Sequence, residues 1–180
     1  TGYQRFEGKV VVVTGAAGDI GRETIQRFAR EGAHVVAVDF NADRVSALAS
    51  ELKSQGFLCS AVVADVTQEA DVKRYVEHAC TEFGGVDVLF NNAGMEGESS
   101  DIGDCDLDDF DRVMAVNVRG VVLGMKYVVP VMQARAGGAI VNTASVAGMS
   151  GAPGLTSYCA SKHAVIGLTR SVAMQQGVNN

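Results

Sequence analysis

Short runs of β-branched residues alternate with longer amphipathic segments along this chain, and the alternation strongly constrains its fold. The runs expected as strands are residues 9–14, 34–39, 58–64, 86–90 and 139–143. Apolar residues recur at helical spacing in residues 20–31, 42–54, 68–83, 107–133 and 157–174. Strands that alternate with helices of this length predict a parallel sheet with helices on both faces. Right-handed crossovers then predict a doubly wound, Rossmann-like α/β fold that binds ligands outside the carboxyl ends of its strands.

Composition narrows the class of protein. The 180 residues suffice for one core, so we expect a single domain over residues 1–180. A formal net charge of -6 argues against nucleic-acid binding and against docking on anionic membranes. No apolar run approaches the roughly 20 residues that a membrane span needs. The four cysteines show no metal-ligand spacing, so we expect reduced thiols, no metal site and a cytoplasmic location.

The segment 107–133 is apolar over most of its helical surface. Such a helix must be buried on more than one side. One side can pack on the sheet, and we expect the other to contact a second copy of the chain. The sequence therefore predicts a homo-oligomer, a dimer or tetramer, formed through the helices 107–133 and 157–174.

A glycine-rich turn, TGAAGDIG at residues 14–21, follows the first expected strand and opens the first helix. Gly15 permits the sharp turn, Gly18 lets the backbone approach a phosphate, and Gly21 allows the helix to pack on the strand. The N-terminus of the helix offers free N–H groups and a partial positive charge to a pyrophosphate. Such a turn alone is often only a turn, but its position between strand and helix predicts a dinucleotide site.

Asp39 ends the second expected strand. A carboxylate there accepts hydrogen bonds from the ribose hydroxyls of adenosine and repels a 2′-phosphate. No arginine or lysine adjoins Asp39 in the sequence. NAD is therefore predicted over NADP, the alternative being that Asp39 only caps the next helix.

Tyr158 and Lys162 stand at i and i+4 on the last expected helix, so their side chains share one face. An ammonium beside a phenol favours the phenolate, which suits a general acid/base. Ser145 ends the fifth strand, where its hydroxyl faces the ligand crevice. Asn117 is an amide in the apolar segment 107–133, and burial requires it to be hydrogen-bonded. A Tyr-x-x-x-Lys pair is common by chance. Its position after Ser145, in a chain that also carries the glycine turn, favours a catalytic role.

The turn at 14–21, NNAG at 91–94 and the Ser145, Tyr158 and Lys162 pattern together resemble the short-chain dehydrogenase/reductase family. This resemblance implies an NAD-dependent oxidoreductase that moves a hydride between nicotinamide and a secondary alcohol or ketone. The implied catalytic residues are Asn117, Ser145, Tyr158 and Lys162. The implied cofactor-binding residues are Gly15, Gly18, Asp19, Ile20, Gly21, Asp39, Asp65, Val66, Asn91, Ala93, Gly94, Tyr158 and Lys162.

Each implied catalytic residue has a role by this resemblance. Ser145 positions and polarises the substrate oxygen, and Tyr158 is the general acid/base. Lys162 supports the phenolate and binds the nicotinamide ribose, while Asn117 supports a proton relay. Asp65 resembles the family's adenine-binding position, although it fits a strand-end turn equally well.

The resemblance covers the chain up to about residue 173, whereas members of the family continue from the last helix into further strands and a substrate loop opened by Pro-Gly. We expect a part of a longer enzyme rather than a naturally short member. Two other functions stay open: a catalytically silent NAD-binding scaffold or regulatory subunit, and an NADP-dependent ketoacyl-type reductase, which Asp39 disfavours. Residues 95–98 and 149–153 are expected to rim the pocket and resemble enzymes acting on cyclic secondary alcohols or diols. The sequence specifies neither the substrate nor the direction of reaction.

Overall fold

The computed structural model describes residues 4–135 and 137–177. The strands are β1 (Val10–Thr14), β2 (His34–Asp39), β3 (Cys59–Val63), β4 (Val88–Asn91) and β5 (Ala139–Asn142). The main helices are α1 (Asp19–Arg30), α2 (Ala42–Ser54), α3 (Glu69–Phe83), α4 (Leu107–Met114), α5 (Gly120–Gln133) and α6 (Thr156–Gln176). Short helical turns are η1 (Ile102–Asp104), η2 (Ala115–Arg119) and η3 (Val146–Gly148). The predicted alternation is confirmed, with ends that differ by a few residues.

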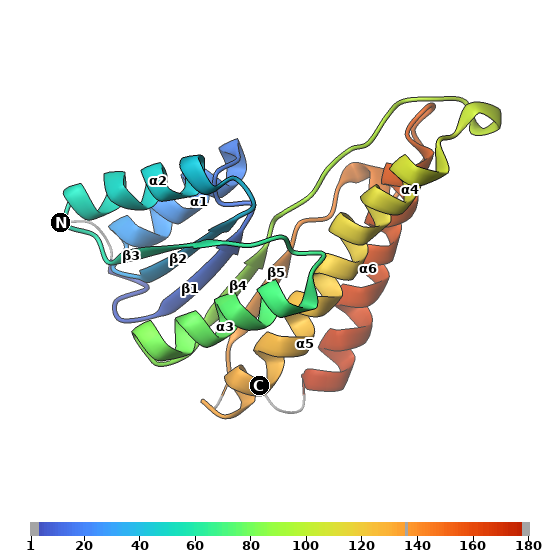
Figure 1. Cartoon of the computed structure of the whole chain (residues 1–180). Helices are drawn as coiled ribbons and strands as arrows, with labels where there is room; N and C mark the ends of the chain where they lie inside the picture. The colour runs from blue at the N-terminus through green and yellow to red at the C-terminus, as the bar shows by residue number, and fades with distance from the viewer. Residues whose placement is uncertain (1–3, 136, 178–180) are drawn as a thin grey trace.

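The strands form one parallel sheet in the order β3-β2-β1-β4-β5. The order reverses beside β1, because β2 and β3 extend to one side of it and β4 and β5 to the other (Figure 1). Ligands of such sheets bind at the carboxyl ends of the strands on either side of this reversal. The predicted doubly wound, Rossmann-like fold is confirmed.

The side chains of β1 point alternately to the two faces of the sheet, and both faces are covered by helices. Val10 and Val12 point into a core shared with α3 and α5, whereas Val11 and Val13 point into a core shared with α1 and α2. All four valines are at most 1% exposed. A strand buried on both faces has no polar side to offer water, which accounts for the unbroken valine run.

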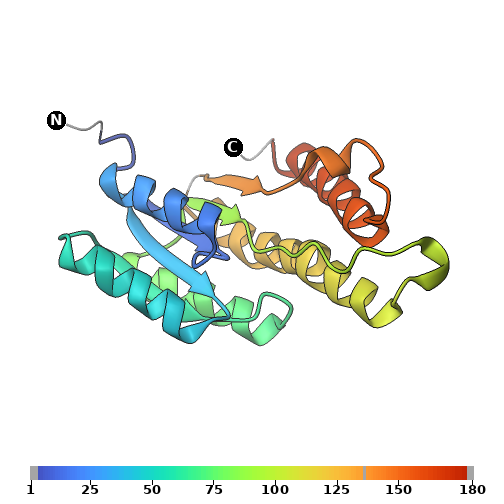
Figure 2. The same cartoon turned by 90° about the horizontal axis from the view of Figure 1, so that it is seen from above.

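The helices α4 and α5 run on as one through the π-helical turn η2, alongside α6 (Figures 1 and 2). By length and composition Leu107–Gln133 is apolar enough to cross a membrane, although the sequence was expected to hold no such segment. Its packing identifies a core helix, because Leu123, Val128 and Met132 lie against the sheet core. Single π turns inside α-helices often mark functional sites.

The second apolar face of α5 packs within the same chain. Val121 and Met125 form a cluster with Val165 of α6. The sequence argument that this face meets another subunit therefore overlooked α6, which supplies the missing apolar partner. Outside this packing, Val122 of α5 remains 37% exposed.

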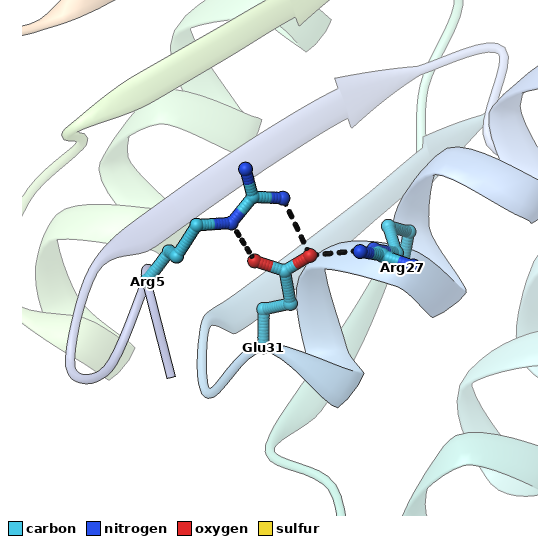
Figure 3. Close-up of polar contacts among 3 residues, drawn as sticks. All are labelled: Arg5, Arg27 and Glu31. Carbon is cyan, nitrogen blue, oxygen red and sulfur yellow. Dashed lines mark hydrogen bonds and ion pairs between the residues drawn. The ribbon is translucent and has the colours of Figure 1, made fainter. Parts of the chain in front are cut away.

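An ion-pair cluster ties the segment before β1 to the end of α1 (Figure 3). The guanidinium of Arg5 donates to both carboxylate oxygens of Glu31 over 2.5 and 2.7 Å, and Arg27 Nε donates over 2.5 Å. The backbone joins them too, since Phe6 N–H donates to the Glu31 carbonyl over 3.0 Å. Hydrogen bonds from Arg5 chiefly, with help from Arg27, lower the pKa of Glu31 to about 2.

We expect Glu31→Gln to remove an acid-sensitive part of the stability. Because the folded pKa of about 2 lies below the ordinary value of 4.5, the ionised carboxylate stabilises the fold above about pH 4.5. That contribution is lost as the pH falls towards 2. Urea midpoints at pH 7, 4 and 3 should therefore differ most between variant and parent at pH 7. Glu23→Gln, at an exposed position on α1, is the matched control, and an equal loss in both variants would contradict the assignment.

Candidate functional site

The glycine turn between β1 and α1 needs its glycines for different reasons. Gly15 has φ +63°, and a Cβ there would lie 2.9 Å from the Ala93 Cα. A Cβ at Gly21 would lie 2.1 Å from the Gly15 carbonyl oxygen. At Gly18, by contrast, a Cβ would meet only that same oxygen at 3.4 Å, an ordinary contact. The fold therefore needs Gly15 and Gly21, whereas Gly18 leaves open space towards a ligand.

Gly18 is also the N-cap of α1 and supplies no side chain to cap it. The first backbone bond of the helix runs from Arg22 N–H to the Gly18 carbonyl over 2.8 Å. The earlier N–H groups, including those of Asp19 and Ile20, have no intrahelical acceptor and point outward. These donors and the helix dipole together form a cradle for a phosphate.

A cavity of about 890 Å³ opens from this cradle. Its size is near the top of the range of roughly 300–1,000 Å³ for small-molecule sites. It is lined by residues 15, 18–21, 39–41, 44, 64–67, 92–95, 112, 115 and 116. The structure therefore brings most of the predicted cofactor-binding residues together in one lining, whereas Asn91, Tyr158 and Lys162 are not among its residues. An extended dinucleotide fits such a cavity, since the phosphate cradle and the Asp39 carboxylate both open into it.

Asn91 is not among the residues that line this cavity, and its role as a cofactor contact stays a prediction. The residue is 4% exposed, and its Nδ2 donates to the Asn142 Oδ1 over 2.9 Å and to the Val121 carbonyl over 3.4 Å. Its side chain sits against Gly124, where a Cβ would lie 2.4 Å from the Asn91 Oδ1. Successive residues of a strand point to opposite faces, so Asn91 joins β4 to β5 and α5 while Asn92 faces the cavity.

Asn92 and Thr14 belong to the two quoted motifs but were not among the predicted site residues, and they join β1 to β4 at the cavity. The Thr14 hydroxyl accepts hydrogen bonds from the N–H groups of Asn92 and Ala93 over 3.0 and 3.1 Å. In return Asn92 Nδ2 donates to the carbonyls of Thr14 and Gly15 over 3.2 and 3.3 Å. Their position at the carboxyl ends of two neighbouring strands was the available signal. This pairing fixes the glycine turn relative to residues 92–94.

The carboxylate of Asp39 is held from two sides. Its Oδ2 accepts from Ala17 N–H over 2.9 Å and its Oδ1 from Asn41 N–H over 3.0 Å. Asp39 does not cap α2, because Asn41 is the N-cap and accepts from Arg44 N–H over 3.0 Å. The alternative left open by the sequence is therefore wrong, and Asp39 lines the cavity.

Arg44 is a cation at this end of the cavity that was not evident from the sequence. No cation adjoins Asp39 in the sequence, but the first turn of α2 brings Arg44 to the same cavity wall. Its Nη2 donates to the Ala17 carbonyl over 2.6 Å. The distance of five positions along the chain hid this proximity.

Asp65 shapes a turn and also lines the cavity, so its role at an adenine position stays a prediction. Its Oδ1 accepts from Thr67 N–H over 2.9 Å, which shapes the turn after β3. The residue is exposed and lines the cavity together with Val66.

Asn117 lies in the π turn η2, and its amide is fully engaged. Met95 N–H donates to its Oδ1 over 2.8 Å, and its Nδ2 donates to the Met95 carbonyl over 2.8 Å. The same Nδ2 reaches the Ser161 Oγ over 3.0 Å, and this hydroxyl donates to the Tyr158 carbonyl over 2.7 Å. Ser161, fully buried, was not expected from the sequence. It joins Asn117 to the turn of α6 that carries Tyr158 and Lys162.

Lys162 is 4% exposed and lies close to Tyr158. Its Nζ is 5.5 Å from the centroid of the Tyr158 ring and donates to the Thr143 carbonyl over 2.8 Å. Burial lowers the pKa of Lys162. A Cβ at Gly94 would lie 3.5 Å from the Lys162 Nζ, so this ammonium lies next to one residue of the cavity lining, although Lys162 itself is not part of that lining. Tyr158 itself is partly buried.

Ser145 stands between β5 and η3, in extended backbone, and its Oγ accepts from Ala147 N–H over 3.2 Å. The next turn packs tightly on α6, because a Cβ at Gly148 would lie 2.7 Å from the Lys162 carbonyl. The serine segment is thereby docked against the helix that bears the Tyr-Lys pair. Within the described residues, no group of three or more His, Cys, Asp or Glu side chains is arranged to hold a metal ion.

The fold and this site define a class: doubly wound α/β proteins that bind a ligand where the strand order reverses. A family model described as short chain dehydrogenase matches residues 9–180. The chain therefore belongs to the short-chain dehydrogenase family, as its motifs predict.

Two curated relatives are levodione reductase from Leifsonia aquatica, 38% identical over 96% of this chain, and cyclohexanol dehydrogenase from an Acinetobacter strain, 37% identical over 95%. The chain spans 66% and 68% of their lengths. Among solved structures, levodione reductase superposes with a TM-score of 0.94 at 38% identity, covering 97% of this chain and 69% of that one. NAD⁺-bound xylitol dehydrogenase gives a TM-score of 0.95 at 39% identity, covering 98% and 68%.

Proposed function

We propose that this protein is an NAD-dependent oxidoreductase that transfers a hydride between nicotinamide and a secondary alcohol or ketone. The observation that carries the proposal is the buried Lys162 ammonium, held 5.5 Å from the centroid of the Tyr158 ring and next to Gly94 of the cavity lining. The names of two relatives, a levodione reductase and a cyclohexanol dehydrogenase, support an alcohol or ketone substrate. The NAD⁺-bound state of a similar structure supports the cofactor.

In the proposed mechanism the cavity orients the dinucleotide from both ends. Backbone N–H groups of the glycine turn hold the pyrophosphate, and Asp39 and Asp65 take the adenosine side. When bound, the nicotinamide accepts or supplies the hydride. Ser145 donates a hydrogen bond to the substrate oxygen, and Tyr158 removes or returns its proton.

Lys162 and Asn117 support the Tyr158 hydroxyl in different ways. The Lys162 ammonium stabilises the phenolate electrostatically, and the Thr143 carbonyl fixes its Nζ at 2.8 Å. The Asn117 side chain is occupied by Met95 and Ser161, so we assign it a positioning role in the proton relay. It holds residues 94–95 against α6 and so keeps the cavity in register with the Tyr-Lys pair.

The Asp39→Ala variant tests the cofactor assignment. A carboxylate that binds the ribose hydroxyls and repels a 2′-phosphate favours NAD on both counts. Its loss should raise the KM for NAD about ten-fold or more, and should leave the KM for NADP unchanged or lower it. Steady-state kinetics with both cofactors on a cyclic secondary alcohol measure this. Asp43→Ala, at an exposed position on α2 outside the cavity, controls for the change in net charge. Equal effects of Asp39→Ala on both cofactors would refute the assignment.

We further propose that the protein works in the cytoplasm as a homo-oligomer, a dimer or tetramer, formed through the outer faces of helices 107–133 and 157–174. Exposed Val122 and Met174 on these helices support such a contact. All four cysteines are free, which suits a reducing compartment. Light scattering that returns the mass of one chain at micromolar concentration would oppose the assembly.

A further inference from the structure

An arginine closes the adenosine end of the cavity, next to the carboxylate proposed to select NAD. The side chains of Arg44 and Asp39 hold the same residue from opposite sides. Arg44 Nη2 donates to the Ala17 carbonyl over 2.6 Å, and Asp39 Oδ2 accepts from Ala17 N–H over 2.9 Å. Both side chains line the cavity, together with Phe40 and Asn41. The adenosine subsite therefore presents both signs of charge.

The charge of Arg44 is not neutralised by a carboxylate. Within the residues that the structure describes, the ion pairs within 4.0 Å do not include Arg44. A guanidinium carries five N–H donors, and the Ala17 carbonyl occupies one of them. The residue is exposed, so the remaining donors face the cavity mouth and solvent. Planar donors of this kind match a phosphate, which they can bind through two hydrogen bonds at once.

Asp39 blocks the use of these donors. Two backbone N–H groups fix its carboxylate, and the residue is only 7% exposed, so it cannot turn away from an arriving anion. The same geometry shows what removal of the carboxylate would release. Asn41 N–H, now bound to Asp39 Oδ1 over 3.0 Å, would become a free donor at the N-terminus of α2. That helix end and Arg44 would then both favour a negative charge.

We propose that Arg44 is a second cofactor-selectivity residue, which forms a phosphate subsite for NADP that Asp39 masks. The proposal rests on the proposed dinucleotide function and deepens it. Selectivity at this site is then a balance between two charges on one cavity wall, rather than the effect of Asp39 alone. The 2′-phosphate of the adenosine ribose is the group that the Arg44 guanidinium would bind.

Fluorescence titration with NADH and NADPH tests the proposal without requiring turnover. The proteins compared are the parent, Asp39→Ser, Arg44→Ala and the double variant. Asp39→Ser should tighten NADPH binding about ten-fold or more, and adding Arg44→Ala should remove most of that gain, since a charged hydrogen-bonded contact has this effect on affinity. Arg44→Ala should weaken NADPH binding more than NADH binding. Raising the salt concentration should also weaken NADPH binding to Asp39→Ser.

Two further variants complete the design. Lys53→Ala removes one positive charge from the exposed side of the same helix, outside the cavity, and should leave both affinities unchanged. Asp39→Asn keeps the shape of the side chain and replaces Asp39→Ser if the latter binds neither nucleotide.

Each contrary outcome has a distinct meaning. Equal NADPH affinity in Asp39→Ser with and without Arg44 would overturn the subsite. Equal weakening of NADH and NADPH by Arg44→Ala would overturn it as well, because Arg44 would then only hold the glycine turn through Ala17. A parent protein that binds NADH, with Asp39 variants that gain no NADPH affinity, would refute this inference alone. A parent that binds neither nucleotide would refute the proposed function itself.

Discussion

Tyr158→Phe should keep NADH binding and lose turnover by about 10²–10⁴-fold, the range that a positioned general acid/base contributes. The substitution removes only the hydroxyl that is proposed to exchange a proton with the substrate. The ring remains to pack beside Lys162, whose Nζ lies 5.5 Å from its centroid. NADH titration should therefore match the parent, while NADH absorbance with a panel of cyclic secondary alcohols and ketones should show almost no turnover.

Tyr127→Phe is the matched control for this experiment. It removes a hydroxyl of the same kind from α5, where Tyr127 is hydrogen-bonded to Glu69 rather than to the site. Turnover should survive in that variant. Retained activity in Tyr158→Phe would contradict the catalytic assignment. A parent protein that binds NADH but turns over none of the panel would instead favour the silent NAD-binding subunit.

Local rules were enough to predict most of the fold. The valine run of β1 packs on two cores because alternate side chains point to opposite faces, and that periodicity is visible in the sequence. The glycine turn follows from its position between a strand and a helix, and a cavity does open there. Element ends were predicted less well, since the last turn of a helix or strand depends on neighbours that the sequence does not place.

The features that the sequence did not predict depend on contacts between distant parts of the chain. Asn91 and Asn92 are adjacent, yet only Asn92 lines the cavity, because the Asn91 side chain is bonded to Asn142 of β5 and to α5. The apolar face of α5 meets α6, and no pattern within residues 107–133 can indicate which partner covers it. Arg44 and Ser161 likewise acquire their contacts from other elements, Ala17 before α1 and Asn117 in η2.

Gly21→Ala should damage both stability and dinucleotide binding. An added Cβ would lie 2.1 Å from the Gly15 carbonyl oxygen and 2.8 Å from the Ala16 Cα. These are backbone atoms of the turn itself, so the turn must move rather than a flexible side chain. Overpacking of this kind costs about 1–3 kcal/mol. Because the same turn presents the N–H groups to the pyrophosphate, NADH affinity should fall together with the urea midpoint.

Two other glycines separate the requirements of the fold from those of the ligand. Gly167→Ala introduces the same methyl group into α6, where nothing lies within 4 Å, and should raise stability by about 0.5–1 kcal/mol. Gly18→Ala meets only an ordinary contact within the chain, so it should weaken NADH binding with a smaller loss of stability than Gly21→Ala. If Gly18→Ala and Gly21→Ala lower NADH affinity and stability in the same proportion, Gly18 serves the fold and not a bound phosphate. If Gly18→Ala lowers NADH affinity but keeps the urea midpoint of the parent, the space above Gly18 belongs to the cofactor.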